Sequence, residues 1–361
     1  YGGTTSALGF KSEGTNFTGS LLIGHSTTGT ISSAENNTGV GISALDALTT
    51  GDNNVAIGGS TGSALTEGNQ NVLIGKDAGL ALTTGGQNTA VGFEALKTED
   101  TGYTATAIGF RALKVQDGGN TYNTAVGHEA GAAVTTGTHN VLLGGLAGDA
   151  LTTGVGNIAI GYESLSTEDG DGKNVAVGHK TLKYQNAGAD AYNVAVGYQA
   201  GINVSTGVQN TIVGGLAGDA LTTGIGNVAV GYDALSTEDA HGLNVAVGAS
   251  ALSSLNAGAN AYNVAVGYQT GIAMTTGIRN TIIGGLTGVG LTTGQFNVAL
   301  GFNSLSSEDD HGRNTAIGTN TLQAQNAGAD AYNVAVGYDA GFAVTTGTEN
   351  VFIGGLAGDA L

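Results

Sequence analysis

Short runs in which bulky and small hydrophobic residues alternate recur along the chain, and each run lies between an asparagine and a glycine. The best preserved run is Asn193-Val194-Ala195-Val196-Gly197. Successive closing glycines lie about 17 residues apart, with a few slightly longer steps, and such a fixed period predicts a repeat architecture. They are Gly41, Gly58, Gly75, Gly92, Gly109, Gly127, Gly144, Gly161, Gly178, Gly197, Gly214, Gly231, Gly248, Gly267, Gly284, Gly301, Gly318, Gly337 and Gly354, with a weaker copy at Gly24.

The alternation of β-branched valines with alanine predicts one short strand in each repeat. Because the repeat unit is too short for a strand, a helix and two loops, we predict an all-β fold. This fold is a parallel β-solenoid of about 20 coils, in which each strand pairs with its copy in the next coil. The closing glycine supplies a positive φ, and stacked asparagines are expected to form a ladder. We assign the strand valines to the core.

Two positions downstream of each closing glycine vary together, and we name them +4 and +7 by their distance from that glycine. Gly201 at +4 is followed by Val204 at +7, whereas Leu235 at +4 is followed by the polar Glu238. Leu255 is an exception, since it is apolar at +7 after a leucine at +4. Because overfilling a packed interior is unfavourable, we infer that the two positions share one core volume.

The coils form sets of four, so that the pattern of one set returns in the next after a superperiod of about 70 residues, as from Gly197 to Gly267. The fourth coil of each set carries extra residues, as in 256–262, that we expect to bulge outward as a loop. We divide the chain into irregular N-terminal coils over residues 1–40 and a continuous solenoid array over 41–361. Within the first part, 7–10 and 22–25 are interpreted as degraded coil ends.

The two ends of the chain are related to each other. The chain stops at Leu361 in the middle of a coil, and if Tyr1 followed it, Gly9 and Phe10 would arrive close to the next expected closing glycine. One interpretation is that the chain is a piece of a longer periodic protein. The other is that subunits stack end to end, with Tyr1, Gly9, Phe10 and Leu361 at the joint, since an open strand edge invites pairing.

Composition excludes several classes of function. The chain has no cysteine, which rules out disulfides, thiolate metal sites and cysteine nucleophiles. Its net charge of −18, from 28 acidic and 10 basic residues, argues against nucleic acid and anionic membrane surfaces as partners. No apolar run is long enough to span a bilayer as a helix, so we predict no membrane insertion by this chain.

The motif Asn-Val-Ala-Val-Gly-Tyr-Gln-Ala-Gly, followed by Thr-Thr-Gly, resembles the head repeats of the YadA-like trimeric autotransporter adhesins. It is similar also to repeats of the same length in bacterial surface proteins and phage tail fibres, and the resemblance covers residues 37–361. It implies a homotrimeric β-roll in a stiff extracellular, cell-surface fibre that contacts a host or surface receptor or a glycan. The alternative is the shaft of a phage tail fibre involved in host recognition. Coils of the adhesin heads are shorter, so the handedness of the solenoid stays open.

Acidic pairs recur once in every superperiod, and two of them are followed by a histidine. The pairs are Glu99-Asp100, Glu168-Asp169, Glu238-Asp239 and Glu308-Asp309, with His241 and His311 after the last two. Carboxylates with imidazole are able to bind a divalent cation. We interpret the pairs instead as solvated acidic loops and predict no metal, no cofactor and no catalytic residue. Since no Ser-His-Asp or HExxH spacing accompanies them, we predict that the protein is not an enzyme.

Aromatic residues fall into two groups. One group follows a closing glycine directly and is assigned to structural packing: Phe93, Phe110, Tyr162, Tyr198, Tyr232, Tyr268, Phe302 and Tyr338. The other group sits at the long loops and comprises Tyr122, Tyr192, Tyr262 and Tyr332. Because an aromatic ring offers a large face for stacking, we expect the loop tyrosines to contact a receptor.

Overall fold

A computed structural model describes residues 10–14, 17–24, 31–170 and 172–360 of the chain. Every regular element in these ranges is a β-strand, which confirms the all-β prediction, and they contain no helix capable of crossing a membrane. Contacts divide the chain into two compact units, Tyr1–Asn174 and Val175–Leu361, and we describe each unit by itself.

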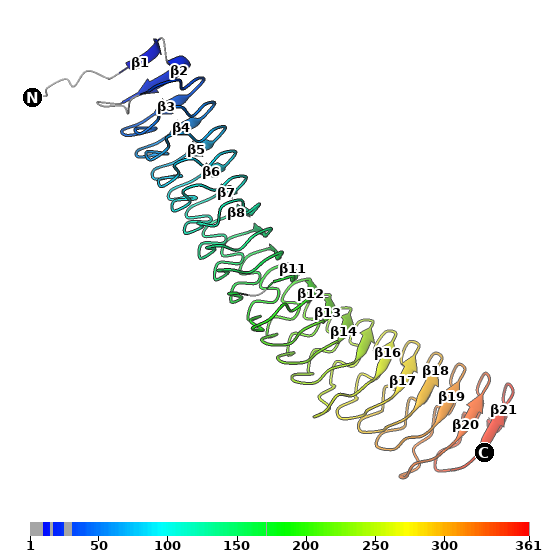
Figure 1. Cartoon of the computed structure of the whole chain (residues 1–361). Helices are drawn as coiled ribbons and strands as arrows, with labels where there is room; N and C mark the ends of the chain where they lie inside the picture. The colour runs from blue at the N-terminus through cyan, green and yellow to red at the C-terminus, as the bar shows by residue number, and fades with distance from the viewer. Residues whose placement is uncertain (1–9, 15–16, 25–30, 171, 361) are drawn as a thin grey trace, which may run out of the picture. The chain divides into compact units, whose positions relative to one another are not determined.

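In the first unit, short strands follow one another at the period of the repeat (Figure 1). The strands are β1 (Phe10–Gly14), β2 (Phe17–Ile23), β3 (Thr38–Val40), β4 (Val55–Ile57), β5 (Val72–Ile74), β6 (Thr89–Val91), β7 (Thr106–Ile108), β8 (Thr124–Val126), β9 (Val141–Leu143) and β10 (Ile158–Ile160). From β2 onward each strand pairs in parallel with the next, as a β-solenoid requires.

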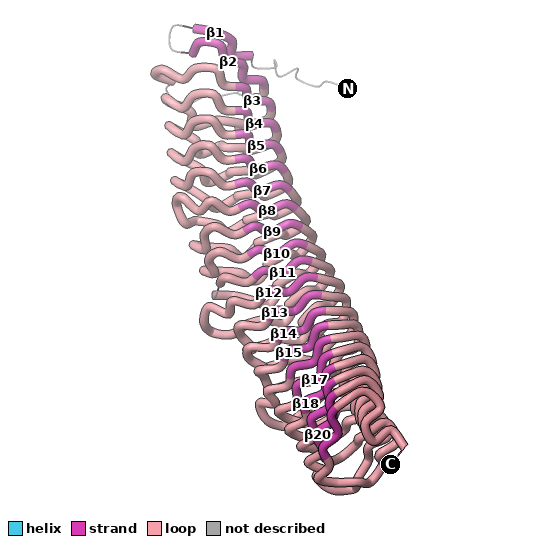
Figure 2. The backbone as a smooth tube through the Cα atoms, turned by 90° about the vertical axis from the view of Figure 1, so that its right-hand side faces the viewer, coloured by secondary structure: helices cyan, strands magenta, loops and turns pink. Residues whose placement is uncertain are grey.

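The second unit repeats this arrangement. Its strands are β11 (Val175–Val177), β12 (Val194–Val196), β13 (Thr211–Val213), β14 (Val228–Val230), β15 (Val245–Val247), β16 (Val264–Val266), β17 (Thr281–Ile283), β18 (Val298–Leu300), β19 (Thr315–Ile317), β20 (Val334–Val336) and β21 (Val351–Ile353). Consecutive strands are parallel and keep the register of the repeat, so Ala195 lies beside Ile212. Figure 2 shows the strands of each unit in one row along one side of the stacked coils.

The strands turn their central residue, and not their valines, toward the interior. Ala195 and Ile212 at the centres of their strands are fully buried, whereas Val194 and Val196 are 38% and 37% exposed. The assignment of the strand valines to the core is therefore wrong. The buried strand centre is alanine in most coils but is a large residue in others, as at Leu142 and Ile212, so the same face of the strand is buried whatever the size of its central residue. The flanking β-branched residues instead cover the outer face of the sheet.

Closing glycines are required by close stacking as well as by their backbone conformation. Gly197 has a φ of 141°, which only glycine adopts readily. A Cβ at this position would lie 2.4 Å from the carbonyl oxygen of Gly214 in the next coil. The same approach recurs from Gly41 to Gly337, so a side chain at any of these closing glycines would push neighbouring coils apart.

The expected asparagine ladder is present and buried. In the first unit, Asn54 makes two contacts with Asn37 of the preceding coil: its backbone N–H and its Nδ2 donate to Asn37 Oδ1 at 2.9 and 3.0 Å. Its Nδ2 also donates to the carbonyl oxygen of Gly68 at 2.8 Å. Each asparagine thus satisfies backbone groups on two sides, which stabilises an interior where an unpaired polar group costs about 1–3 kcal/mol.

The +4 and +7 positions share one interior volume, as predicted, and the strand centre also contributes to it. A Cβ on Gly201 would lie 2.8 Å from Ile212 Cδ1, 3.1 Å from Leu182 Cδ2 and 3.2 Å from Val204 Cγ2. Where leucine occupies +4, as at Leu235, its backbone takes a left-handed φ of 52°. Filling the core therefore outweighs the backbone strain of a bulky residue at positive φ.

The long loops and the N-terminal segment complete the fold. The extra residues of one fourth coil, 258–260, are exposed and Ala261 returns to the interior, so the insert bulges outward as expected. Leu22 pairs with Gly39 in parallel register, and 22–24 therefore do end a coil. Phe10 instead begins β1, which is antiparallel to β2, so the expectation of a coil end at 7–10 is wrong at Phe10; residues 1–9 lie outside the described residues.

Candidate functional site

The acidic turns lie between consecutive strands, with their first carboxylate inside the solenoid. Glu238 follows β14 at the +7 position that holds Val204 in another coil, and it is fully buried. Asp239 is exposed, as expected for a solvated loop. The interpretation of the pair as entirely solvated is wrong for its glutamate, because the +7 position belongs to the core.

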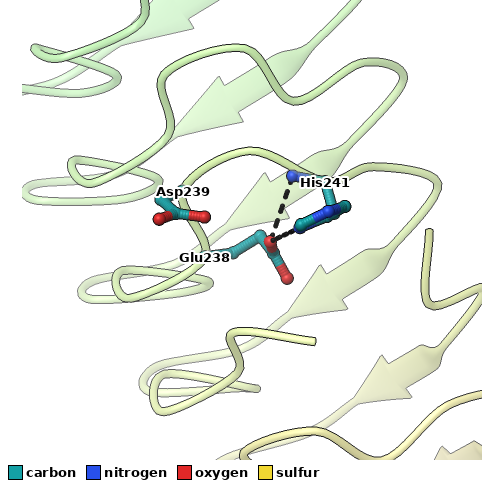
Figure 3. A group of neighbouring side chains, drawn as sticks. All are labelled: Glu238, Asp239 and His241. Carbon is teal, nitrogen blue, oxygen red and sulfur yellow. Dashed lines mark hydrogen bonds and ion pairs between the residues drawn. The ribbon is translucent and has the colours of Figure 1, made fainter. Parts of the chain in front are cut away.

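Glu238 has weak hydrogen-bond partners and one imidazole beside it (Figure 3). Its Oε1 accepts a hydrogen bond from the backbone N–H of His241 at 3.2 Å and lies 3.5 Å from Nδ1 of the same histidine. Its Oε2 accepts from the backbone N–H of Ala257 at 3.3 Å. Burial raises the pKa of Glu238, and these donors and His241 oppose the rise.

The same turn recurs one superperiod later with Glu308, Asp309 and His311. Glu308 is fully buried, and burial raises its pKa. Its Oε2 accepts a hydrogen bond from Nδ2 of Asn314 at 3.4 Å. Glu308 Oε1 and His311 Nδ1 are both buried atoms without a hydrogen-bond partner. In each of the two turns one glutamate, one aspartate and one histidine offer ligand atoms within 4.8 Å of one another.

The first copy of the turn is built differently, because Gly102 stands where the later copies have histidine. Glu99 Oε1 accepts from the backbone N–H of Gly102 at 2.8 Å, and Oε2 accepts from Nε2 of Gln116 at 3.1 Å. Gln116 in turn accepts from Asn123 Nδ2 at 2.9 Å. Burial still raises the pKa of Glu99, which these donors oppose.

Two exposed aspartates lie beside the first copy. Asp100 and Asp117 bring carboxylate oxygens within 4.8 Å of a Glu99 oxygen, so this group offers oxygen ligands alone. Burial of the Asp117 carboxyl, together with the charge of Asp100, raises the pKa of Asp117.

The second copy contains Glu168, which is likewise fully buried and accepts a hydrogen bond from Asn174 Nδ2 at 3.4 Å. The residue equivalent to the later histidines is Asp171, which lies outside the described residues. The buried glutamate is therefore common to all four copies. The residue three positions after it differs, and is Gly102, Asp171, His241 or His311.

A separate ion cluster surrounds Glu94 in the first unit. Its carboxylate lies 2.6 Å from Lys97 Nζ, 2.9 Å from Arg111 Nε and 3.4 Å from Lys114 Nζ. Hydrogen bonds from Lys97 and then Arg111 lower the pKa of Glu94 to about 2. The cluster joins neighbouring coils, and sequence reasoning missed it because these four residues are not adjacent in the chain.

Aromatic residues after the closing glycines form half-exposed rows. Tyr198 is 55% exposed and Tyr232 is 61% exposed, so these rings are not part of the core. Where rings occupy consecutive coils they stack on one another, with centroids 5.4 Å apart for Phe93 and Phe110 and 5.0 Å apart for Phe110 and His128. The structural packing assigned to this group occurs between coils at the surface.

The four loop tyrosines, Tyr122, Tyr192, Tyr262 and Tyr332, lie at equivalent positions and are each about half exposed. Because successive copies are one superperiod apart, the structure does not bring them together within a unit. Their immediate surroundings differ, since the Tyr122 ring stacks on His139 and the Tyr332 ring faces the guanidinium of Arg313. Of the proposed joint residues, Tyr1, Gly9 and Leu361 lie outside the described residues.

A shallow hollow beside Tyr332 was not found from the sequence. It has a volume of about 260 Å³ and is lined by Thr293, Gln295, Phe296, Asp310, Arg313 and Asp330. Within it, Arg313 Nε donates to Asp330 Oδ2 at 2.6 Å, and the Arg313 guanidinium lies 5.2 Å from the centre of the Phe296 ring. The signal in the sequence is an alternation of arginine and aromatic residues immediately before successive ladder asparagines.

In comparisons with known proteins, no protein-family model matches the chain and no curated protein is detectably similar to it. The fold therefore stands on the geometry described above. The resemblance to adhesin and tail-fibre repeats remains a prediction from the sequence.

Proposed function

We propose that the protein is a structural and adhesive segment of an extracellular, cell-surface fibre. The observation that carries this proposal is the solenoid itself, in which one coil is repeated with its strands, ladder asparagines and closing glycines in constant register. Such an array gives a stiff scaffold whose outward positions vary freely. No enclosed catalytic constellation is needed for this role.

We further propose that the fibre is a homotrimer held through the outer face of the sheet, where rows of valine, isoleucine and threonine flank each buried strand centre. The supporting observation is the exposure of these residues, 38% at Val194 and 37% at Val196, in a continuous surface of the kind that marks protein contacts. End-to-end association of such trimers into filaments is a second mode of self-assembly that the periodic chain supports.

Light scattering behind a sizing column tests this proposal. We expect the mass of three chains, and we expect Val194→Lys combined with Val196→Lys to give single chains. Thr206→Lys is the matched control, since Thr206 is exposed outside the strand, and it should remain trimeric. A single chain for the unaltered protein would contradict the homotrimer, and long filaments would support end-to-end stacking.

Receptor contact is assigned to the loop tyrosines, with Tyr332 and the adjacent hollow as the strongest surface. Its aromatic rings, guanidinium, carboxylates and hydroxyls suit the hydroxyl groups and apolar faces of a glycan. Screening of the protein on immobilised glycans should give binding that Tyr332→Ala and Arg313→Ala reduce at least tenfold, with Thr206→Ala, at an exposed position outside these loops, as the control. The alternative role, a phage tail-fibre shaft, predicts tail genes beside the coding gene instead of a surface anchor.

A further inference from the structure

We propose that the two histidine-containing turns, formed by Glu238, Asp239 and His241 and by Glu308, Asp309 and His311, are binding sites for a transition-metal dication of the Zn²⁺ type. The proposal concerns residues that the fibre role does not use, and it stands independently of that role. It rests on the spacing of the ligand atoms, on buried atoms that have no partner, and on a matched turn without histidine.

The ligand spacing fits a small tetrahedral ion. Zn²⁺ binds imidazole nitrogen and carboxylate oxygen at about 2.0–2.2 Å, so two tetrahedral ligand atoms lie about 3.3–3.5 Å apart. Glu238 Oε1 and His241 Nδ1 are 3.5 Å apart, a length that is long for a hydrogen bond between them. Asp239 supplies a third ligand atom within 4.8 Å of the other two, which leaves a fourth position for water. Figure 3 shows the His241 ring and the Glu238 carboxylate directed at each other.

Unpartnered atoms point into the second copy of the site. Glu308 is fully buried, yet its Oε1 makes no hydrogen bond of ordinary geometry, although the backbone N–H groups of His311 and Asp309 lie near the carboxylate, and the adjacent His311 Nδ1 is also buried and unpartnered. A buried carboxylate oxygen without a partner is strongly unfavourable when it is charged. A dication between Oε1 and Nδ1 would satisfy both atoms at once. His241 Nδ1 in the first site has no hydrogen-bond partner either.

The other carboxylate oxygen is held in place in both sites, as metal ligands usually are. Glu238 Oε2 accepts from the backbone N–H of Ala257, and Glu308 Oε2 accepts from Asn314 Nδ2. These contacts orient each carboxylate so that Oε1 is the oxygen left toward the histidine. The matched turn at Glu99 has one ordinary hydrogen bond to each carboxylate oxygen and Gly102 in place of histidine, so it lacks both the nitrogen ligand and the unpartnered oxygen.

The chemistry of the ligands selects the class of ion. Ca²⁺ takes six to eight oxygen ligands and Mg²⁺ keeps most of its water, whereas one imidazole with two carboxylates suits Zn²⁺ and its neighbours in the first transition row. Since imidazole must be deprotonated to bind, the affinity should fall on acidification.

Titration calorimetry of the purified chain with ZnCl2 tests the proposal. We expect about two ions per chain at pH 7.5, at least tenfold weaker binding at pH 5.5, and no comparable binding of CaCl2. His241→Gly combined with His311→Gly, which copies the residue at Gly102, should abolish both sites while circular dichroism stays unchanged. Asp239→Ala combined with Asp309→Ala should weaken binding at least tenfold.

His139→Ala is the matched control, because His139 is hydrogen-bonded to Thr138 Oγ1 and belongs to neither turn. It should retain two ions per chain. The proposal is overturned if the double glycine variant binds as many ions as the unaltered chain, if His139→Ala removes binding, or if calcium binds in place of zinc.

Discussion

The turns at Glu99 and Glu238 place the same residue in the same interior position and stabilise it by different means. Glu99 has Gln116 in the next coil and the backbone N–H of Gly102, which together give each carboxylate oxygen a donor. Glu238 has Leu255 in the next coil, two long backbone hydrogen bonds and His241 instead. The difference shows that the solenoid accepts a buried acid both with short hydrogen bonds, as at Glu99, and with weaker compensation, as at Glu238.

The largest effect is expected from emptying the interior beside the first turn. Leu96 fills the +4 position of the Glu99 coil and is fully buried. Leu96→Gly should lower the free energy of unfolding by about 2–4 kcal/mol, because the loss of packing and the cavity exceed the relief of a φ of 50°. Urea unfolding measures the change, and an unchanged midpoint would contradict the shared core volume. Thr98→Gly, at a more exposed position of the same coil, is the control.

A smaller loss is expected when the polar chain of the first turn is broken. Glu99→Leu removes the acceptor from Gln116 Nε2 and from the backbone N–H of Gly102. Leaving these buried donors unpaired should cost about 1–3 kcal/mol at neutral pH. Equal or greater thermal stability in this variant would show that the hydrogen bonds of Glu99 do not compensate its burial.

The same substitution at Glu238 is expected to raise stability instead of lowering it. Glu238→Leu creates the pair of leucines that Leu252 and Leu255 already form in the following coil. Replacing a poorly compensated buried carboxylate by an apolar side chain should raise stability by about 1 kcal/mol in the presence of a metal chelator. If Glu238→Leu instead lowered stability as much as Glu99→Leu, the two buried glutamates would be equally well compensated, and the proposed difference between the turns would be wrong.

The dependence of stability on pH should also distinguish the two kinds of carboxylate. Burial raises the pKa of Glu238 above its ordinary 4.5, so the folded state holds its proton more tightly and stability falls as pH rises through the raised value. The pKa of Glu94 is lowered to about 2 from its ordinary 4.5, so its contribution is complete above the ordinary value and is lost as pH falls toward 2. Because Glu99 and Glu308 also have pKa values raised by burial, urea unfolding across the acidic and neutral range should show the first slope become smaller, and not vanish, in Glu238→Leu. The second slope should become smaller in Glu94→Gln.

Periodicity predicts most of the fold, because a coil that pairs with its own copy has only one register. The strands, the ladder asparagines, the closing glycines and the shared +4 and +7 volume all follow from residues at fixed spacing. Periodicity did not predict which residues of each strand point into the interior. Val-Ala-Val has the same alternation whichever face is buried, so the alternation alone does not decide between Ala195 and Val194.

The candidate site was partly present in the pattern and was misinterpreted. Glu238 occupies the +7 position that is apolar in many other coils, and this alone indicates burial of its carboxylate. The sequence analysis instead interpreted Glu238 and Asp239 together as a solvated loop, an interpretation that suits Asp239 alone. The sequence spacing also does not show that His241 lies beside Glu238 or that Gln116 donates to Glu99, because both contacts depend on the directions of the side chains.

Anomalous diffraction at the zinc absorption edge, from crystals of the chain grown with ZnCl2, tests the comparison of the turns most directly. The account predicts two strong peaks per chain, one between Glu238 and His241 and one between Glu308 and His311, and none at Glu99. A peak of equal height at Glu99, or no peak at either histidine-containing turn, would contradict it.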